Sequence, residues 1–385
     1  MRAATGVCAS AEEKQRLCDE FARLCEIESP SLSERGMADA VATELRTSGL
    51  EVEEDESASE TGADAGNLIA RIPGAPSRAQ AASDRFVLLC AHLDTVPLAA
   101  PVEVALENGS YRNRNEAILG ADNKAAVAVL LGLARRLARE PAAVGVELVF
   151  TTCEELALQG AKAIDRAALR SDYGFVFDHA SPIGELIVAA PTYYRLEARF
   201  RGQAAHAGIR PEAGRNAIAA AAAAIAELEL GRLDEETTAN VGTIAGGSSA
   251  NVVAECCNVE LEARSLDHDR ATAVATRMLD TVGAAATDGD CDVETILSEQ
   301  FRGYRLQRGS PPVVAATAAL EALGIEQSQI GTGGGSDANV FVAAGLPCLN
   351  VANGTAHNHQ PDESVTVAAL ETMLDVAIGI VAACE

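Results

Sequence analysis

The sequence predicts an α/β protein in which a larger domain, a mixed sheet with helices on both faces, is interrupted by a smaller α+β domain. The chain has 385 residues, too many for one ordinary hydrophobic core. Up to about residue 190, apolar strand-like runs alternate with helical patterns, as in layered α/β domains. The pattern then changes to strands with one polar face, and the buried pattern returns after residue 301. We therefore expect residues 1–189 and 302–385 to form the larger domain and residues 190–301 the insertion.

The elements of the larger domain follow from hydrophobic periodicity. Residues 12–25 carry Leu17, Phe21 and Leu24 on one stripe, the mark of a helix packed on a core. Residues 86–92 are a continuous apolar run, typical of a strand buried on both faces. The same reasoning predicts helices at 34–47, 123–137, 160–169, 312–323 and 367–383, strands at 67–72, 144–151 and 174–178, and a loop at 74–84.

The insertion has a different pattern. Between residues 194 and 201 the apolar Leu196, Ala198 and Phe200 alternate with charged residues, and residues 259–264 alternate in the same way. Such strands have one wet face and are usually antiparallel. Residues 216–230 and 270–286 are the expected helices, which makes the insertion a domain of two helices and one sheet.

Composition excludes several classes of function. Asp and Glu number 56 against 30 Lys and Arg, a formal net charge of -26. This charge disfavours binding to nucleic acid and to anionic membranes, which attract basic surfaces. No apolar run reaches the roughly 18 residues of a membrane-spanning helix.

The ten cysteines are scattered, without a CxxC pair, and most have apolar neighbours, as Cys90 does. We expect reduced, buried thiols and a cytoplasmic protein. The adjacent Cys256 and Cys257 are the alternative, a redox or metal pair.

Polar residues gather where the predicted buried strands end, and ligands of α/β domains collect at such ends. His92 and Asp94 share a face of their strand. One ring nitrogen of His92 can therefore bind a metal ion while the N–H of the other ring nitrogen donates a hydrogen bond to Asp94. Four more clusters lie at residues 120–124, 153–155, 175–179 and 350–363. Each alone is compatible with a solvated loop or, at Asp122, with a helix N-cap. Their common placement favours a metal site.

Six segments carry a family resemblance. They are His92-Leu-Asp94-Thr-Val-Pro97, Gly120-Ala-Asp122, Glu154-Glu155, Asp178, Gly202-Gln-Ala-Ala-His206-Ala-Gly208 and Gly334-Gly-Ser-Asp337-Ala-Asn339. In this order they resemble the M20 family of zinc metallopeptidases, and most of all its peptidase T-like branch. The first motif together with the Glu-Glu pair is specific, whereas any single piece is not.

The resemblance implies a catalytic domain with two zinc ions and a lid or dimerisation domain at residues 190–301. His92, Asp122 and Asp178 would hold one ion. Asp122, Glu155 and His359 would hold the other, which makes Asp122 the bridge. The residue types independently favour zinc, with Mn²⁺ and Co²⁺ as alternatives.

The resemblance also assigns the catalytic groups. Glu154 would be the general base that takes a proton from water and passes it to the leaving nitrogen. Asp94 would accept a hydrogen bond from the ring nitrogen of His92 that does not bind the metal. His206, in the insertion, would stabilise the oxyanion, often in the site of a partner subunit; a surface histidine in a glycine-flanked loop is the alternative.

The last ligand position and the bridging ligand each leave two alternatives. His357 and His359 compete for the last ligand position, and the family pattern, with a Glu four residues after the ligand, favours His359 because Glu363 follows it. The family usually has Asp-Asp at the bridge, whereas this chain has Asp122-Asn123. The second residue is not a ligand in the family, so we expect the bridge to be kept.

Substrate contacts are predicted for Arg264, Asn251 and Ser336. A guanidinium at position 264 would grip a substrate carboxylate, and an exposed ion pair is the alternative. The turn at residues 331–336 lacks the Gly-Lys-Ser/Thr of a phosphate loop, so we expect it to support the substrate backbone.

These features predict a di-zinc exopeptidase acting on short peptides as a homodimer through the insertion. An N-acyl-amino-acid deacylase or desuccinylase could use the same metals and base. An inactive binding protein on this fold is a third hypothesis, but Glu154 and His92 are both present.

Overall fold

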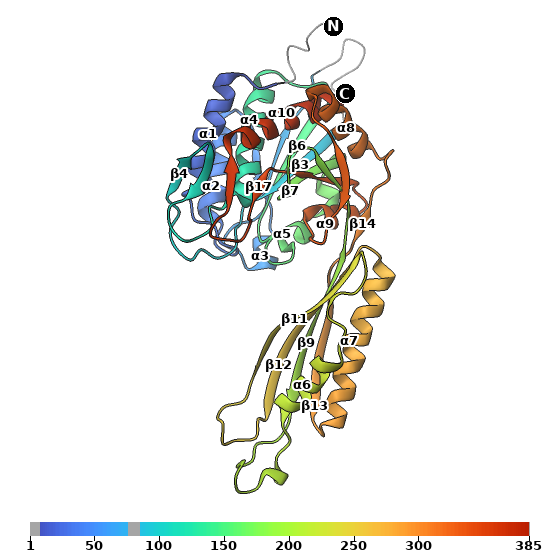
Figure 1. The fold of residues 1–385 in the computed structure, drawn as a ribbon. Coiled ribbons are helices and arrows are strands. Elements are labelled where there is room, and N and C mark those ends of the chain that lie inside the picture. Colours follow the sequence, from blue (N-terminus) through green and yellow to red (C-terminus); the bar gives the residue numbers. More distant parts are fainter. Residues whose placement is uncertain (1–7, 76–84, 385) are drawn as a thin grey trace. The chain divides into compact units, whose positions relative to one another are not determined.

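The computed structural model describes residues 8–75 and 85–384 and divides into two compact units (Figure 1). Unit 1 holds the chain up to Val188, Leu306–Gly331 and the chain from Ser336 onward, and unit 2 holds Ala189–Arg305 and Thr332–Gly335. The predicted insertion, residues 190–301, lies within unit 2, and its role as a lid or dimerisation domain stays a prediction. Of the loop predicted at residues 74–84, residues 76–84 lie outside the described part of the chain.

Unit 1 is built on a mixed sheet with the strand order β1-β2-β6-β3-β7-β16-β8. The neighbours β6, β3, β7 and β16 are parallel, and β2 and β8 pair antiparallel on either side of them. Parallel strands bring their carboxyl ends to one edge of a sheet, where α/β proteins bind ligands. The strands are β1 (Val52–Glu54), β2 (Leu68–Ile72), β3 (Phe86–His92), β6 (Gly145–Thr151), β7 (Ser171–His179), β8 (Glu185–Ala190), β15 (Ser328–Gly331), which pairs with β8, and β16 (Cys348–Ala352).

Helices cover both faces of this sheet, as the sequence predicts. Val87, Leu89 and Ala91 of β3 share a core with α4, and Cys90 points the other way, with its Sγ 3.7 Å from Asp337 at the start of α9. The helices are α1 (Ala11–Cys25), α2 (Arg35–Thr47), α3 (Ala58–Thr61), α4 (Ala121–Arg139), α5 (Gln159–Ala163), α8 (Pro311–Leu323), α9 (Asp337–Ala343) and α10 (Val367–Ala383).

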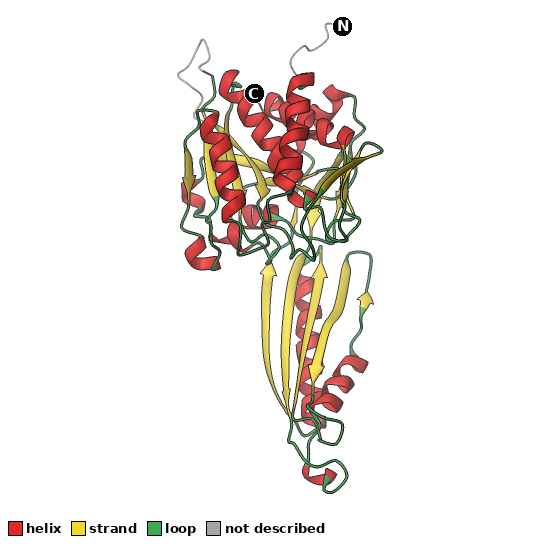
Figure 2. Ribbon diagram, turned by 90° about the vertical axis from the view of Figure 1, so that its left-hand side faces the viewer, coloured by secondary structure: helices red, strands yellow, loops and turns green. Residues whose placement is uncertain are grey.

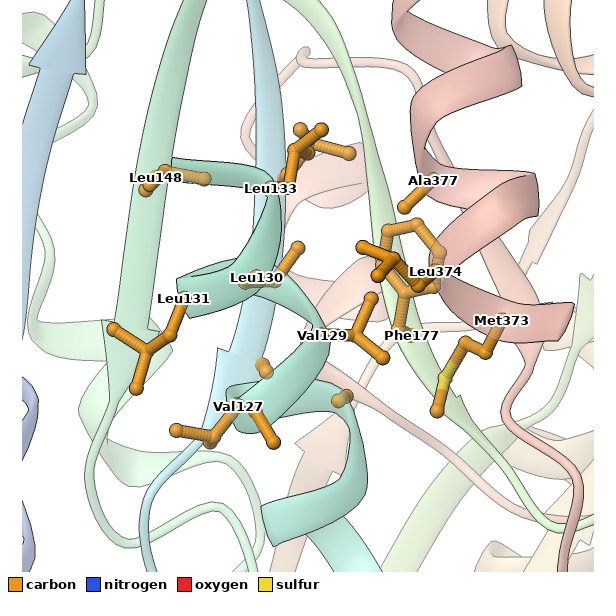
Figure 3. Close-up of a cluster of buried hydrophobic side chains, with 14 of the residues drawn as sticks. Val127, Val129, Leu130, Leu131, Leu133, Leu148, Phe177, Met373, Leu374 and Ala377 are labelled. Atoms are coloured by element: carbon orange, nitrogen blue, oxygen red, sulfur yellow. The ribbon is translucent and has the colours of Figure 1, made fainter. Parts of the chain in front are cut away.

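The core of unit 1 centres on α4, which is buried on nearly all sides. Figure 3 shows Leu130 and Val129 of α4 between the sheet and α10, with Phe177 of β7 and Leu374 of α10 close by. A helix with apolar residues on all sides is normally buried within the core of its domain. This placement fixes the N-terminal end of α4, and with it Asp122, beside the sheet.

A small second sheet of unit 1, with the order β17-β18-β5-β4, has no counterpart in the prediction. Its strands are only two to four residues long, too short for a periodic signal. They are β4 (Val104–Glu107), β5 (Ser110–Asn113), β17 (Thr355–Ala356) and β18 (Ser364–Thr366). The loop between β17 and β18 carries His357 and His359.

The helix predicted at residues 160–169 is wrong in its length. The helix α5 ends at Ala163, and Ile164 is extended with φ -68° and ψ 124°. Asp165 then caps a separate 3₁₀ turn, Arg166–Ala168, by accepting a hydrogen bond from the N–H of Ala167. This local side-chain cap competes with helix continuation.

Unit 2 is an antiparallel sheet with helices on one face (Figure 2). Leu196, Ala198 and Phe200 of β9 pack under the helices, and the charged residues between them face outward, as the alternation predicts. The sheet order is β10 (Gly231–Arg232), β11 (Thr237–Gly246), β12 (Cys256–Ser265), β9 (Thr192–Arg201) and β13 (Asp292–Phe301), and the other elements are α6 (Ala217–Glu227), α7 (His268–Asp288), a 3₁₀ turn Pro211–Ala213 and β14 (Tyr304–Arg305).

In the described ranges, no helix has both the length and the apolar character needed to cross a membrane.

Candidate active site

The predicted site residues of unit 1 meet at the carboxyl edge of its sheet. His92 ends β3, and Asp178 is the penultimate residue of β7, two strands that pair in parallel. The His92 Nε2 atom lies 3.3 Å from Asp122 Oδ1 and 3.5 Å from Asp178 Oδ1. One donor atom from each of the three residues fits within 4.8 Å of the others, a spacing that one metal ion could span.

A second group shares Asp122. The His359 Nε2 atom lies 3.3 Å from Asp122 Oδ2 and 2.9 Å from Glu155 Oε1, and donor atoms of these three residues also lie within 4.8 Å of one another. The two oxygens of Asp122 therefore face two different histidines, as expected of a carboxylate that bridges two ions. His357 lies outside this group: its side chain is exposed and its Nδ1 is 3.4 Å from Asp362. The assignment of these residues as ligands stays a prediction.

The electrostatics of the groups suit bound cations. Burial alone would lower the pKa of His92, but the charge of Asp178 and the contacts with Asp122 and Asp94 raise that pKa well above its ordinary value. Burial raises the pKa of Asp178 to about 7 although His92 opposes the rise. Contacts with Asp122 and Glu155 raise the pKa of His359 to about 10. Carboxylates outnumber imidazoles here, and buried carboxylates need paired positive charge. A mixed carboxylate and imidazole set fits zinc.

Glu154 lies beside both groups. It is buried, and donor atoms of Glu154, Glu155 and His92 also fall within 4.8 Å of one another. Burial, followed by the negative charge of Asp178, raises the pKa of Glu154 well above its ordinary value. Its place beside both donor groups is where a general base could reach a water molecule.

Asp94 supports more than the histidine ring. The His92 Nδ1 atom is 2.9 Å from the backbone carbonyl of Asp94 and 3.4 Å from its Oδ1, so the nearer acceptor is the backbone. The carboxylate instead accepts the backbone N–H groups of Glu154 at 3.0 Å and Glu155 at 3.1 Å. Ser31, whose role the sequence did not predict, donates its hydroxyl to Asp94 at 2.7 Å. Asp94 thus holds the backbone of the Glu-Glu pair.

Asn350 is a further residue that the sequence did not single out. Its Oδ1 accepts the N–H of Asp178 at 3.0 Å, and its Nδ2 donates to the carbonyl of Asp178 at 2.9 Å. Asn350 belongs to β16, which pairs in parallel with β7. Its hydrogen bonds with Asp178 therefore connect two neighbouring strands. Its one sequence signal was its position at the start of the last polar cluster.

In unit 2, His206 and Asn251 lie together. The loop around His206 pairs with residues 251–253: the N–H of Ala207 donates to the carbonyl of Asn251 at 3.0 Å, and His206 bridges to Val252. His206 is exposed, and its Nδ1 accepts the N–H of Gly208 at 3.2 Å. A neutral ring with Nδ1 as acceptor carries its proton on Nε2, which makes Nε2 a donor.

Arg264 lies elsewhere in unit 2. Its guanidinium stacks over the ring of Tyr193 at 4.2 Å and donates to Glu262 at 3.1 Å and to the carbonyl of Gly333 at 3.3 Å. Tyr193 stands near the start of β9, and His206 follows the end of that strand at Arg201. At about 3.4 Å per residue, the strand separates these ends by about 27 Å.

Ser336 is buried in unit 1 as the N-cap residue of α9, and its backbone N–H donates to Asn339 Oδ1 at 3.1 Å. The predicted substrate contacts of Ser336, Asn251 and Arg264 stay predictions.

Known proteins resemble both units. The family model of a peptidase dimerisation domain matches residues 192–290, and that of peptidase family M28 matches residues 67–187. The chain is 34% identical to the uncharacterized protein YqjE of Bacillus subtilis, over 96% of this chain and 98% of that protein.

Two solved structures are similar over nearly the whole chain. Aminopeptidase PepT from Bacillus cereus has a TM-score of 0.86 and 32% identity, and the match covers 98% of this chain and 100% of that one. A tripeptidase from Staphylococcus aureus has a TM-score of 0.87 and 29% identity, covering 96% of this chain and 98% of that one. Similarity of this extent includes both units and the order of the segments at the site. The chain therefore belongs to the M20 family of metal-dependent peptidases and is related within it to peptidase T.

Proposed function

We propose that this chain is a di-zinc exopeptidase that releases the N-terminal residue of short peptides. The observation that carries the proposal is the pair of donor groups that share Asp122, with Glu154 buried beside them. The similarity to an aminopeptidase and a tripeptidase over nearly the whole chain supports the substrate class.

Glu154, Asp94 and Arg264 have separate roles in the proposed reaction. Two zinc ions, when bound, would polarise the peptide carbonyl and make a water molecule more acidic. Glu154 accepts the proton of the attacking water and delivers it to the leaving nitrogen. Asp94 keeps Glu154 in place through the backbone N–H of that residue, at 3.0 Å. Arg264 would orient a substrate carboxylate by exchanging its contact with Glu262 for one with the peptide.

The separation of Arg264 and His206 supports a site made by two chains. The ends of β9 near which they lie are about 27 Å apart along the strand, whereas a tripeptide spans at most about 11 Å. One copy of unit 2 therefore does not offer both residues to one short peptide. We propose that His206 acts in the site of the partner subunit, where its Nε2 proton stabilises the oxyanion by about 3–4 kcal/mol.

Complementation tests this arrangement. Glu154→Gln chains and His206→Ala chains should each be nearly inactive as homodimers. In a co-expressed heterodimer, the chain with intact Glu154 receives His206 from its partner, so one of the two sites is complete and turnover per dimer should return to about half of wild type. The measurement is peptide hydrolysis by heterodimers purified through two different affinity tags.

The control is a doubly tagged dimer in which both chains carry Glu154→Gln, which should stay inactive. Inactive heterodimers would rule out donation between chains and would leave His206 to act within its own chain.

The surface of unit 2 supports a homodimer. Most of the exposed face of α6 is apolar: Ile218, Ala219, Ala222, Ala223 and Ala226 are exposed, and the one charged residue exposed on this helix is Glu227 at its C-terminal end. Next to it, β10 pairs with β11 only at Thr238 and Ala239, so within the described residues 240–246 have β12 as their one partner strand. An open strand edge beside an apolar helix face favours pairing with another chain. A second copy, related by a two-fold axis, would cover both at once.

A charge on this helix should break the dimer. Ala222→Glu would bury a carboxylate against the partner's α6, which is costly without a cation. We expect the variant to run as a monomer in analytical ultracentrifugation, where wild type runs as a dimer. Val314→Glu is the matched control, because Val314 is an exposed apolar residue on a helix of unit 1. A dimer that survives Ala222→Glu would exclude α6 from the interface.

A substrate screen tests the function itself. Dipeptides, tripeptides and N-acyl amino acids should be compared with zinc, manganese and cobalt added separately to the metal-free protein. We expect cleavage of tripeptides after their first residue, with zinc the effective metal. Activity confined to N-acyl amino acids would replace the exopeptidase by the deacylase.

We also propose that the protein works in the cytoplasm, because all ten cysteines are unpaired, as reducing compartments favour. Fractionation of cells that express the protein would test this location.

A further inference from the structure

Glu363 is a buried carboxylate that has no part in the chemistry proposed above. It is 1% exposed and stands at the end of the β17–β18 loop, directly before Ser364 of β18. Its Oε2 accepts the backbone N–H groups of Leu119 at 2.8 Å and Gly120 at 2.7 Å, and its Oε1 accepts that of Asp122 at 2.8 Å. Both oxygens are therefore committed to one short backbone segment, residues 119–122, more than 240 positions away in the chain.

This segment lacks the hydrogen bonds that a regular helix would supply. Asp122 lies within the range of α4, but its φ of -82° and ψ of 104° are not helical. Gly120, just before α4, has a φ of 75°, and a Cβ there would meet Lys124 Nζ at 3.3 Å. The first N–H groups at a helix start have no partner within the helix. Glu363 supplies that partner with its two carboxyl oxygens.

The loop that carries Glu363 also carries His359. Two successive turns connect them: the N–H of Gln360 donates to the carbonyl of His357 at 3.1 Å, and the N–H of Glu363 donates to the carbonyl of Gln360 at 3.0 Å. His359 Nε2 is 3.3 Å from Asp122 Oδ2. One loop therefore holds the backbone of Asp122 and faces its carboxylate.

We infer that Glu363 is a positioning residue that sets where the bridging carboxylate of Asp122 stands relative to His359, and thereby the affinity for the metal ions. The inference rests on the proposed metal site. Glu363 touches neither substrate nor the reacting atoms, and it acts through Asp122. Groups that orient ligands in this way change metal affinity by about 10–100-fold when they are replaced.

The test replaces one oxygen of Glu363 by an amide nitrogen. In Glu363→Gln the NH₂ group faces a backbone N–H, so at least one of the three hydrogen bonds becomes a repulsive contact of two donors. We expect titration calorimetry of the metal-free protein with Zn²⁺ to show an affinity about 10–100-fold lower than that of wild type for at least one ion. Turnover should be lost at limiting zinc and recover when zinc is raised.

Glu147→Gln is the matched control. Glu147 is also a fully buried glutamate that accepts backbone N–H groups, those of Arg170 at 3.0 Å and Ser171 at 3.2 Å. It stands near the start of β6, away from the carboxyl edge where the donor groups lie. Its variant should lower the midpoint of thermal unfolding and leave both zinc affinities unchanged.

The outcomes separate the inference from the function. Zinc affinities equal to wild type in a folded Glu363→Gln variant would overturn the positioning role and leave the di-zinc site standing. A wild-type protein that binds fewer than two zinc ions would overturn both. If Glu363→Gln does not fold, Glu363→Asp is the second variant, because it keeps the carboxyl group but is one methylene too short to reach all three N–H groups. It should show a weaker loss of zinc affinity than Glu363→Gln. Wild-type zinc affinity in Glu363→Asp would also contradict the inference.

Discussion

Replacing Glu154 by glutamine is expected to lower kcat by about 10²–10⁴ while both metal ions stay bound. Glutamine has the shape of glutamate but no basic oxygen, so the attacking water loses its proton acceptor. The backbone N–H of residue 154 can still donate to Asp94, so the position of the side chain should be kept. The measurement is turnover of the best tripeptide from the substrate screen, together with elemental analysis of the same preparation.

Glu155→Gln is the control for this variant. Glu155 is the neighbouring residue, but its Oε1 lies 2.9 Å from His359 in the second donor group. We expect Glu155→Gln to lose activity and metal together, whereas Glu154→Gln loses activity alone. Near-normal turnover in Glu154→Gln would mean that another group is the base, and loss of an ion there would make Glu154 a ligand.

Removing the imidazole of His92 is expected to release at least one of the two ions and to reduce turnover to background. His92 is 1% exposed and lies between Asp122 and Asp178. Without its ring nitrogen, the first donor group retains two carboxylates, too few for the usual coordination of zinc. Elemental analysis of protein purified without chelators should find up to two ions in wild type and no more than one in His92→Ala.

His357→Ala provides the comparison for the metal count. His357 is exposed and pairs with Asp362, so its removal should leave both ions bound. His359→Ala should instead lose an ion, because His359 contacts Asp122 and Glu155. The opposite pattern would exchange the roles of the two histidines, and retention of both ions in His92→Ala would refute the ligand assignment.

The sequence by itself determined the fold class and the longest elements. The stripe of Leu17, Phe21 and Leu24 becomes the buried face of α1, and the apolar run at residues 86–92 becomes the buried strand β3. The alternation at residues 194–201 becomes β9, with one face under the helices. These patterns succeed because burial of a long element repeats with the period of its own backbone.

The sequence also named the residues that the structure collects. His92, Asp122, Asp178, Glu155 and His359 form the two donor groups. The resemblance to the M20 family supplied this set, because a ligand position needs a particular residue type, which can be matched in sequence. The choice between His357 and His359 rested on the family pattern, and the contacts of His359 with Asp122 and Glu155 give that choice a geometric reason.

The tertiary structure alone decided how these residues are held. No local sequence pattern predicts that Glu363 accepts the N–H of Asp122 or that Asn350 accepts the N–H of Asp178. The same is true of the placement of Arg264 and His206 near opposite ends of one strand. The short strands β17 and β18 were missed because they are too short for a periodic signal, and the end of α5 at Ala163 was missed because the local cap by Asp165 competes with continuation of the helix. Periodicity reports the environment of a residue within its own element, whereas a hydrogen bond between residues 122 and 363 exists only after packing has brought two loops to the same edge of the sheet.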